Sequence, residues 1–146
     1  MMEERINLRV ITPQAEKANE PADMVIMLTT TGAMGILPGH EARSVLLDYG
    51  VVRIFSDTEE RRIAVYGGIA EIRDNMLTIL TPGAEWPEDI DHARAEAERE
   101  TIERRLQESR DDTDIQRDQA LLRRSLVRIE VSANPLIAKP DWKEPN

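Results

Sequence analysis

Arginine and carboxylate side chains are the groups in this sequence whose spacing could do chemistry. Arg124 and Arg128 stand four residues apart and Arg117 stands seven before Arg124, so the three share one face of a helix. A row of guanidinium groups suits phosphate or carboxylate ligands, which it binds through paired hydrogen bonds. The spacing leaves three interpretations open: a specific anionic ligand, the acidic surface of a partner protein, or a row of solvated charges.

Other reactive groups are few. His40 and His92 are the only histidines and stand far apart in the chain, so neither a two-histidine metal site nor a Ser/His/Asp arrangement is expected. For His92, in the first turn of a helix, we expect a solvated side chain. The run from Gly32 to His40 resembles a phosphate loop only in its glycines, because no Lys-Ser or Lys-Thr follows. We expect a buried turn there, with three glycine-dependent backbone angles.

Composition and charge exclude several classes of protein. Of the 146 residues, 40% are hydrophobic and 3% aromatic, so the core must be aliphatic and base-stacking surfaces are not expected. A net charge of −9 has the wrong sign for holding nucleic acid. The absence of cysteine favours a reducing compartment. An acidic start over residues 1–5 and the lack of a long apolar run predict a protein that is neither exported nor embedded in a membrane.

Residue usage changes sharply near Pro87. All seven glycines precede it, among short β-branched runs, whereas residues 88–132 hold 13 acids and 9 arginines with neither glycine nor proline. The first composition suits strands and turns, and the second suits helices. We therefore predict an α+β chain: an antiparallel β-sandwich or barrel over residues 1–87, an antiparallel two-helix hairpin over 88–132, and an irregular or disordered tail over 133–146.

Alternating apolar residues place the strands. They predict strands over residues 6–10 and 24–28, a hairpin of 50–55 with 61–66, and a hairpin of 69–73 with 76–80 that has Asp74-Asn75 at its tip. Gly67-Gly68 is expected either to bend the chain or to admit close backbone packing.

The helical half has a weak apolar pattern. The first predicted helix begins at Trp86-Pro87, with proline in its first turn, and runs to about Ser109. Its apolar residues are split between two sides, so the helix needs neighbours to be stable. A second helix follows Thr113. Its apolar stripe consists of Ile115, Leu122, Leu126 and Ile129.

Three features together resemble the epsilon subunit of bacterial F-type ATP synthases. These are the run from Gly35 to His40 in a β-rich half, the Gly67–Ile72 sequence after a hairpin, and the Arg/Glu/Ala-rich pair of helices. The resemblance covers about residues 5–132. It implies a ten-stranded β-sandwich that clasps the gamma subunit and the ring of membrane subunits. It also implies a hairpin that either folds against the sandwich or extends along gamma into the alpha/beta catalytic head, where it blocks ATP hydrolysis.

A finer match lies at the start of the first helix. Residues 90–95 are similar to the Ile/Leu-Asp-x-x-Arg-Ala motif with which some family members bind ATP and hold the hairpin down. The site that this resemblance implies consists of Glu85, Ile90, Asp91, Arg94, Ala95, Arg124 and Arg128, with Glu85 near the adenine and the last two arginines at the phosphates. Thr101 stands where ATP-binding members carry another arginine, which predicts weak affinity. Ile69 replaces a common phenylalanine and is expected to change core packing only.

These observations predict a non-catalytic central-stalk subunit that couples ion translocation to ATP synthesis and inhibits ATP hydrolysis. No cofactor is expected to be required, and ATP would be a regulatory ligand. Its partners would be gamma, the membrane ring and the alpha/beta head, at the cytoplasmic face of the bacterial membrane, which it would touch only through the complex. A free-standing nucleotide sensor and a β-sandwich adaptor that uses its hairpin for an unrelated partner are the alternatives.

Overall fold

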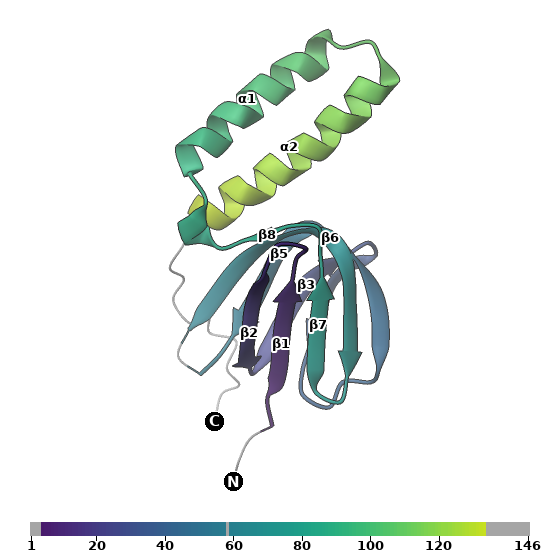
Figure 1. Cartoon of the computed structure of the whole chain (residues 1–146), viewed down its shortest axis with the longest axis vertical. Helices are drawn as coiled ribbons and strands as arrows, with labels where there is room; N and C mark the ends of the chain where they lie inside the picture. Colours follow the sequence, from purple (N-terminus) through teal and green to yellow (C-terminus); the bar gives the residue numbers. More distant parts are fainter. Residues whose placement is uncertain (1–3, 58, 134–146) are drawn as a thin grey trace.

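Strands come first and helices second along the chain. The computed structural model describes residues 4–57 and 59–133, so the tail predicted for 133–146 lies outside the described residues apart from its first position (Figure 1). Eight strands occur in the described part: β1 (Ile6–Ile11), β2 (Glu16–Ala22), β3 (Met24–Thr29), β4 (Gly32–Ile36), β5 (Arg43–Phe55), β6 (Glu60–Arg73), β7 (Met76–Leu80) and β8 (Ala84–Glu85).

The strands form one continuous sheet that closes over a core. Their order is β2-β1-β7-β6-β5-β3-β4, with β8 paired to β6. In Figure 1 the sheet curls, so that β1, β2 and β7 lie in front of β3 and β5. Neighbours are antiparallel except β1 and β7, which run parallel. No hairpin sets the direction of β1 against β7, because most of the strands lie between them in sequence.

The sequence does not predict the two edge strands, β2 and β4. The first is largely polar and contains Pro21, which an edge strand tolerates because one of its sides has no partner. The second occupies Gly32–Ile36, so the buried turn expected from Gly32 to His40 is wrong. Within that run only Gly32 and Gly39 have positive φ, and five of the nine residues are exposed because the strand lies at the sheet edge.

Gly67 and Gly68 mark the point where β6 changes partner. It pairs with β8 at Ala64 and Val65 and with β7 from Ile69 onward. A Cβ on Gly68 would lie 2.1 Å from a backbone carbonyl oxygen of β7, so close backbone packing requires this glycine. The resemblance implies ten strands, whereas the described part of the chain forms eight, because β5 and β6 run unbroken for 13 and 14 residues.

The sandwich core is aliphatic, as predicted, with polar anchors at its margin. The indole Nε1 of Trp86 donates a hydrogen bond to the carbonyl of Lys17 at 2.9 Å, which fixes the chain where it leaves the sandwich. The buried carboxylate of Glu60 accepts hydrogen bonds from Arg53 and Arg62. Burial alone would raise the pKa of Glu60, but these hydrogen bonds outweigh it and hold the pKa below its usual value.

Two antiparallel helices follow the sandwich. They are α1 (His92–Glu108) and α2 (Asp112–Ala133), and a short 3-10 turn, η1 (Pro87–Asp89), precedes them. The predicted start of the first helix at Trp86-Pro87 is wrong, because Pro87 opens the separate turn and Ile90 is extended. Asp91 caps α1 instead, by accepting a hydrogen bond from the backbone N–H of Arg94.

Contacts between the helices are as much polar as apolar. Ala95 and Ile102 of α1 are buried. Arg105 donates to both carboxylate oxygens of Asp118, which is only 2% exposed. His92 Nδ1 lies 2.8 Å from the hydroxyl of Ser132, so a hydrogen bond joins the start of α1 to the end of α2. The His92 side chain is 42% exposed, as expected, but it also joins the two helices, which the sequence did not predict.

The apolar stripe predicted for α2 is only partly buried. Leu126 is 47% exposed, whereas Val127 and Val131 are buried. The reason is that α2 lies against the sandwich as well as against α1 (Figure 1), and its valines pack against β6. There they form a small cluster with Ala64, Tyr66 and Ile90. This cluster is separate from the main core, so the hairpin is docked through a limited apolar contact.

We predict that residues 1–87 fold on their own. The main core contains no residue of either helix, and β8 and Trp86 complete it. Urea unfolding of this fragment, followed by tryptophan fluorescence and circular dichroism, should show one cooperative transition. A fragment of residues 1–83, which lacks β8 and the only tryptophan of residues 1–87 and is therefore followed by circular dichroism alone, should be less stable by about 3 kcal/mol. Non-cooperative unfolding of 1–87 would contradict a unit boundary at Pro87.

Candidate functional site

Glu85, the last residue of β8, lies at the centre of a charged network. Its carboxylate accepts a hydrogen bond from the hydroxyl of Tyr66 on β6. Its Oε1 is 3.0 Å from Arg128 Nε and 3.9 Å from Arg124 Nη2, both on α2. The side chain of Glu85 is 21% exposed, so these ion pairs are partly shielded from water.

The network continues from α2 to α1 through Glu98. This carboxylate is 3.4 Å from Arg128 Nη1 through one oxygen and 3.4 Å from Arg94 Nε through the other. Arg128 is 15% exposed, and its buried Nε makes no hydrogen bond within the described residues, although it lies close to Glu85. Arg94, at 75% exposed, has most of its donors free for water or a ligand.

Tyr66, on β6, contacts both a cation and the central carboxylate of the network. The guanidinium of Arg124 lies over its ring, 4.9 Å from the centroid. Burial, and then the hydrogen bond to Glu85, raises the pKa of Tyr66 well above its usual value, and the charges of Arg124 and Arg128 oppose the rise only in part. The phenol therefore remains a neutral hydrogen-bond donor to Glu85 at physiological pH.

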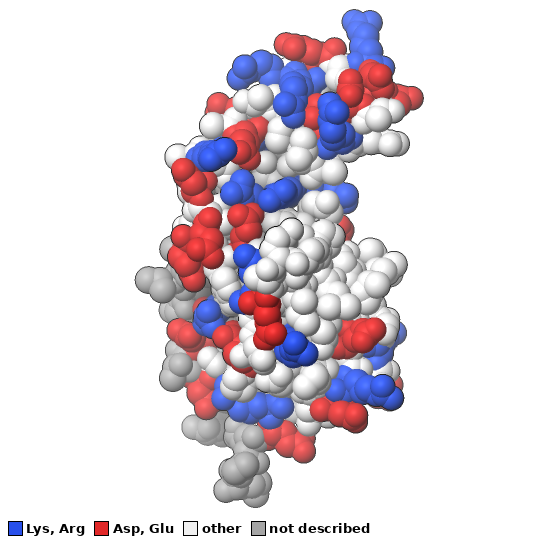
Figure 2. All heavy atoms as spheres, in the orientation of Figure 1, with Lys and Arg blue, Asp and Glu red and all other residues white. Residues whose placement is uncertain are grey.

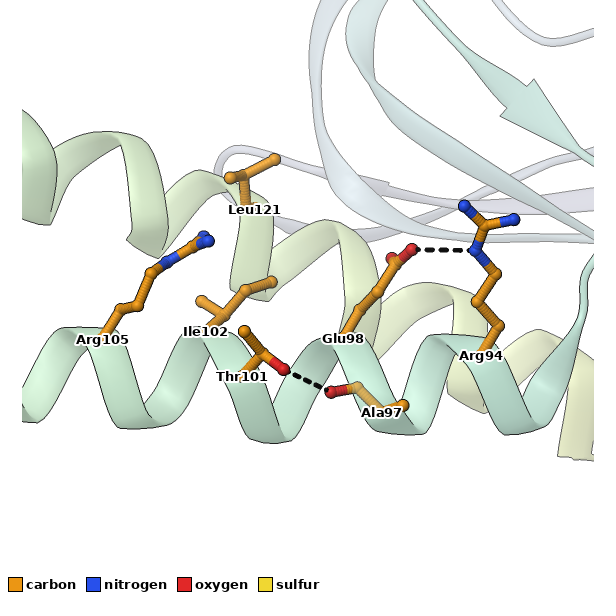
Figure 3. Close-up of a pocket in the computed structure, with 7 residues that line it drawn as sticks. All are labelled: Arg94, Ala97, Glu98, Thr101, Ile102, Arg105 and Leu121. Atoms are coloured by element: carbon orange, nitrogen blue, oxygen red, sulfur yellow. Dashed lines mark hydrogen bonds and ion pairs between the residues drawn. The ribbon is translucent and has the colours of Figure 1, made fainter.

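A groove between the helices opens beside this network. It has a volume of about 430 Å³ and is lined by Arg94, Ala97, Glu98, Thr101, Ile102, Arg105 and Leu121 (Figure 3). Figure 3 shows Glu98 turned toward Arg94. Thr101 donates its hydroxyl to the carbonyl of Ala97, so it offers no cation to the groove. A smaller hollow of about 180 Å³ lies on the α2 side of Glu98, lined in part by Arg124 and Arg128.

The structure brings together some of the residues that the sequence assigned to a site. Glu85, Arg124 and Arg128 are in contact, and Arg94 reaches them through Glu98. The remaining three have local structural roles: Ile90 packs with the valines of α2, Asp91 caps α1, and Ala95 is buried between the helices.

Two members of the network were not predicted. Tyr66 gives no signal in the sequence, because its neighbour Glu85 is distant along the chain. Glu98 could have been found, since it follows Arg94 by four residues, the spacing of a helical ion pair. Its contact with Arg128 depends on how the two helices pack, which the sequence does not reveal.

A second feature is an apolar row on the outside of the sandwich. Leu46, Ile69 and Leu80 are neighbours on β5, β6 and β7 and are 59%, 42% and 45% exposed. In Figure 2 the upper part of the sandwich is largely uncharged, whereas blue and red alternate over the helices. The expectation that Ile69 affects core packing is wrong, because its neighbour Ala70 points inward and Ile69 outward. We call these three residues the apolar row.

Neither a metal cluster nor a membrane-spanning helix emerges within residues 4–57 and 59–133. No group of three or more His, Cys, Asp or Glu side chains there could hold a metal ion. None of the helices in the same residues is long and apolar enough to cross a membrane.

Comparison with known protein families defines the class of protein. The family described as "ATP synthase, Delta/Epsilon chain, beta-sandwich domain" matches residues 5–87, and "ATP synthase, Delta/Epsilon chain, long alpha-helix domain" matches residues 88–133. The chain therefore belongs to the ATP synthase delta/epsilon family. The expected combination of a β-sandwich with a helical hairpin is confirmed.

Individual relatives narrow the assignment to the epsilon chains. The ATP synthase epsilon chain of Bacillus velezensis is 36% identical over 129 residues, which are 88% of this chain and 98% of that one. Those of Syntrophobacter fumaroxidans and Bacillus subtilis are 37% and 38% identical, over 90% and 87% of this chain and over 98% and 96% of their own lengths. The resemblance drawn from the sequence is confirmed, and with it a non-catalytic role within ATP synthase.

Solved structures share the fold. A chain in the Euglena gracilis mitochondrial ATP synthase (OSCP/F1/c-ring, rotational state 1) has a TM-score of 0.78 at 23% identity, over 92% of this chain and 84% of that chain. A chain in the central stalk/c-ring of Tetrahymena thermophila mitochondrial ATP synthase has a TM-score of 0.51 at 18% identity, over 61% and 72%. At these identities the likeness is one of fold.

Proposed function

We propose that this chain binds the gamma subunit and the membrane ring through its sandwich and restrains ATP hydrolysis through its helices. It would work at the cytoplasmic face of the cell membrane and touch the membrane only through the complex. The observation that carries the proposal is the contrast between the two halves. A closed sandwich core stands next to a hairpin that is docked by one small apolar cluster and a few ion pairs.

The apolar row is the surface on which we place gamma. Exposed apolar side chains in register on three adjacent strands lose water favourably when a partner covers them. Ion pairs, by contrast, occupy much of the hairpin surface and favour water. A protein partner with an apolar face of its own fits the row better than an anionic ligand does.

Replacing Leu46 with aspartate should weaken binding to gamma. Leu46 is 59% exposed and has no role in the main core, so the variant should fold normally. A buried, unpaired carboxylate at the interface should cost about 2 kcal/mol or more, which is roughly thirtyfold in affinity. Surface plasmon resonance against immobilised gamma measures it. Leu126→Asp, a similarly exposed leucine on α2, is the control, and equal affinities for the two variants would contradict a gamma surface on the row.

Restraint of hydrolysis requires the hairpin to leave the sandwich. The contact that must break is small: Val127 and Val131 against β6, two arginines over tyrosine rings, and the ion pairs of Glu85 and Asp48 with α2. When ion pairs at a partly exposed interface open, the charged groups regain hydration. This hydration offsets most of the lost attraction, so the net free-energy cost of opening is low. A hairpin held in this way can exchange the sandwich for another partner.

Removal of residues 88–146 should therefore raise ATP hydrolysis. The assembled ATP synthase that carries residues 1–87 should hydrolyse ATP several-fold faster than the complex with the full chain. It should retain the same content of gamma and ring subunits. Hydrolysis is measured with and without detergent activation, because detergent alone relieves some restraints. Unchanged hydrolysis in an intact complex would remove the inhibitory role.

A regulatory ATP site is the second part of the proposal. Three cationic side chains, Arg94, Arg124 and Arg128, border one groove and its adjoining hollow, which supports a triphosphate as the ligand. Glu85 is already engaged with Arg128 and Tyr66, and no cation stands at Thr101. We therefore place the affinity nearer millimolar than micromolar.

Calorimetric titration with ATP and ADP tests this site. Arg124→Ala should weaken ATP binding by roughly tenfold, because it removes one charge-assisted contact worth about 1.5 kcal/mol. Arg124 is half exposed, so its loss should disturb the fold little. Arg117→Ala is the matched control, since Arg117 pairs with Asp114 on its own helix. Neither heat nor thermal stabilisation of the unaltered chain at several millimolar ATP would exclude the site.

A further inference from the structure

Glu98 is the one carboxylate that joins cations of both helices in the described part of the chain. Its Oε1 is 3.4 Å from Arg94 Nε on the same helix, and its Oε2 is 3.4 Å from Arg128 Nη1 on the opposite helix. Figure 3 shows its side chain standing in the groove between Arg94 and Arg105. The contact thus lies where the proposed ATP site would need its phosphates.

A carboxylate offers guanidinium groups the same kind of acceptor as a phosphate does. Both are anionic and present oxygens that accept charge-assisted hydrogen bonds. We propose that Glu98 acts as an internal anionic ligand. It holds Arg94 and Arg128 together when no nucleotide is bound, and a triphosphate must displace it. The inference rests on the proposed ATP site only for the second of these effects.

The cross-helix contact distinguishes Glu98 from an ordinary surface pair. An i,i+4 pair such as Arg94 with Glu98 contributes only a few tenths of a kcal/mol by itself. Arg128, however, is 15% exposed and is already held by Glu85, so its guanidinium is fixed in place before Glu98 reaches it. Binding to a fixed cation loses less side-chain entropy than binding to a mobile one.

The charges at the site indicate whether loss of Glu98 strengthens or weakens ATP binding. The three arginines meet two carboxylates, Glu85 and Glu98, whereas the Tyr66 phenol stays neutral. Glu98 lines both the groove and the hollow beside Arg124, so phosphates that reach all three arginines pass next to it. Removing its charge frees Arg94, leaves Arg128 paired with Glu85 alone, and removes the repulsion between Glu98 and the phosphates. The folded hairpin then loses its internal tie but accepts ATP more readily.

Glu98→Gln, with Glu103→Gln as the matched control, separates these effects. Glu103 also forms an i,i+4 pair, with Arg99, and is 45% exposed against 41% for Glu98, but within the described residues it makes neither a hydrogen bond nor an ion pair with α2. In calorimetric titration of the full chain, Glu98→Gln should bind ATP roughly tenfold more tightly than the unaltered chain. The control should bind ATP as the unaltered chain does. A merely structural role for Glu98 would weaken ATP binding instead.

A second measurement needs no nucleotide. Amide hydrogen exchange over residues 124–133 of α2 should be several-fold faster in Glu98→Gln and unchanged in Glu103→Gln. Unchanged exchange in Glu98→Gln would overturn the internal ligand, and so would unchanged or weaker ATP affinity where the unaltered chain binds ATP. If neither chain binds ATP, the proposed nucleotide site fails, and faster exchange in Glu98→Gln alone still supports the internal ligand.

Discussion

The carboxylate of Glu85 is the contact on which the relation between the two halves depends. Glu85 is the last residue of β8, the last strand of the sandwich. Its carboxylate accepts a hydrogen bond from Tyr66 on β6 and forms an ion pair with Arg128 on α2. A partly buried charge needs partners, and here α2 supplies the strongest one. The position of α2 therefore depends on the ion pair between Glu85 and Arg128. Another anion near Arg128 would compete with Glu85 and weaken this pair. Apolar contact alone, through Val127 and Val131, would give no such dependence.

Much of the fold could be predicted because the spacing of apolar residues along the sequence indicates which side chains are buried. β1 alternates buried and partly buried residues along its length, and the Asp74-Asn75 tip has the positive φ angles that such a turn requires. The edge strands could not be predicted, since β2 is polar and β4 is rich in glycine, and only pairing with a neighbour makes them strands. The stripe on α2 was partly wrong for a similar reason. A helix with two neighbours buries two faces, and Leu126 lies outside both.

Less of the candidate site could be predicted. The resemblance located the cations, and the structure gathers Arg94, Arg124 and Arg128 around one region. What it could not supply was their partners. Arginine spacing along a helix says nothing about which carboxylate of another element comes within reach. Glu98 reads in the sequence as one acid among the 13 of residues 88–132, and its cross-helix contact arises only from packing.

The interior of the hairpin bears on how it could move. Asp118 is almost fully buried and depends on Arg105, so within the folded hairpin this pair must form or a buried charge is left alone. Once the helices separate, both groups regain water, and the free energy of hydration offsets much of the lost contact. A leucine in place of Asp118 would gain no favourable hydration when the helices separate. Separating the helices would therefore cost more free energy with leucine than with Asp118. Buried polar side chains thus make the hairpin specific in its closed form and less costly to open than an apolar interface of the same area would be.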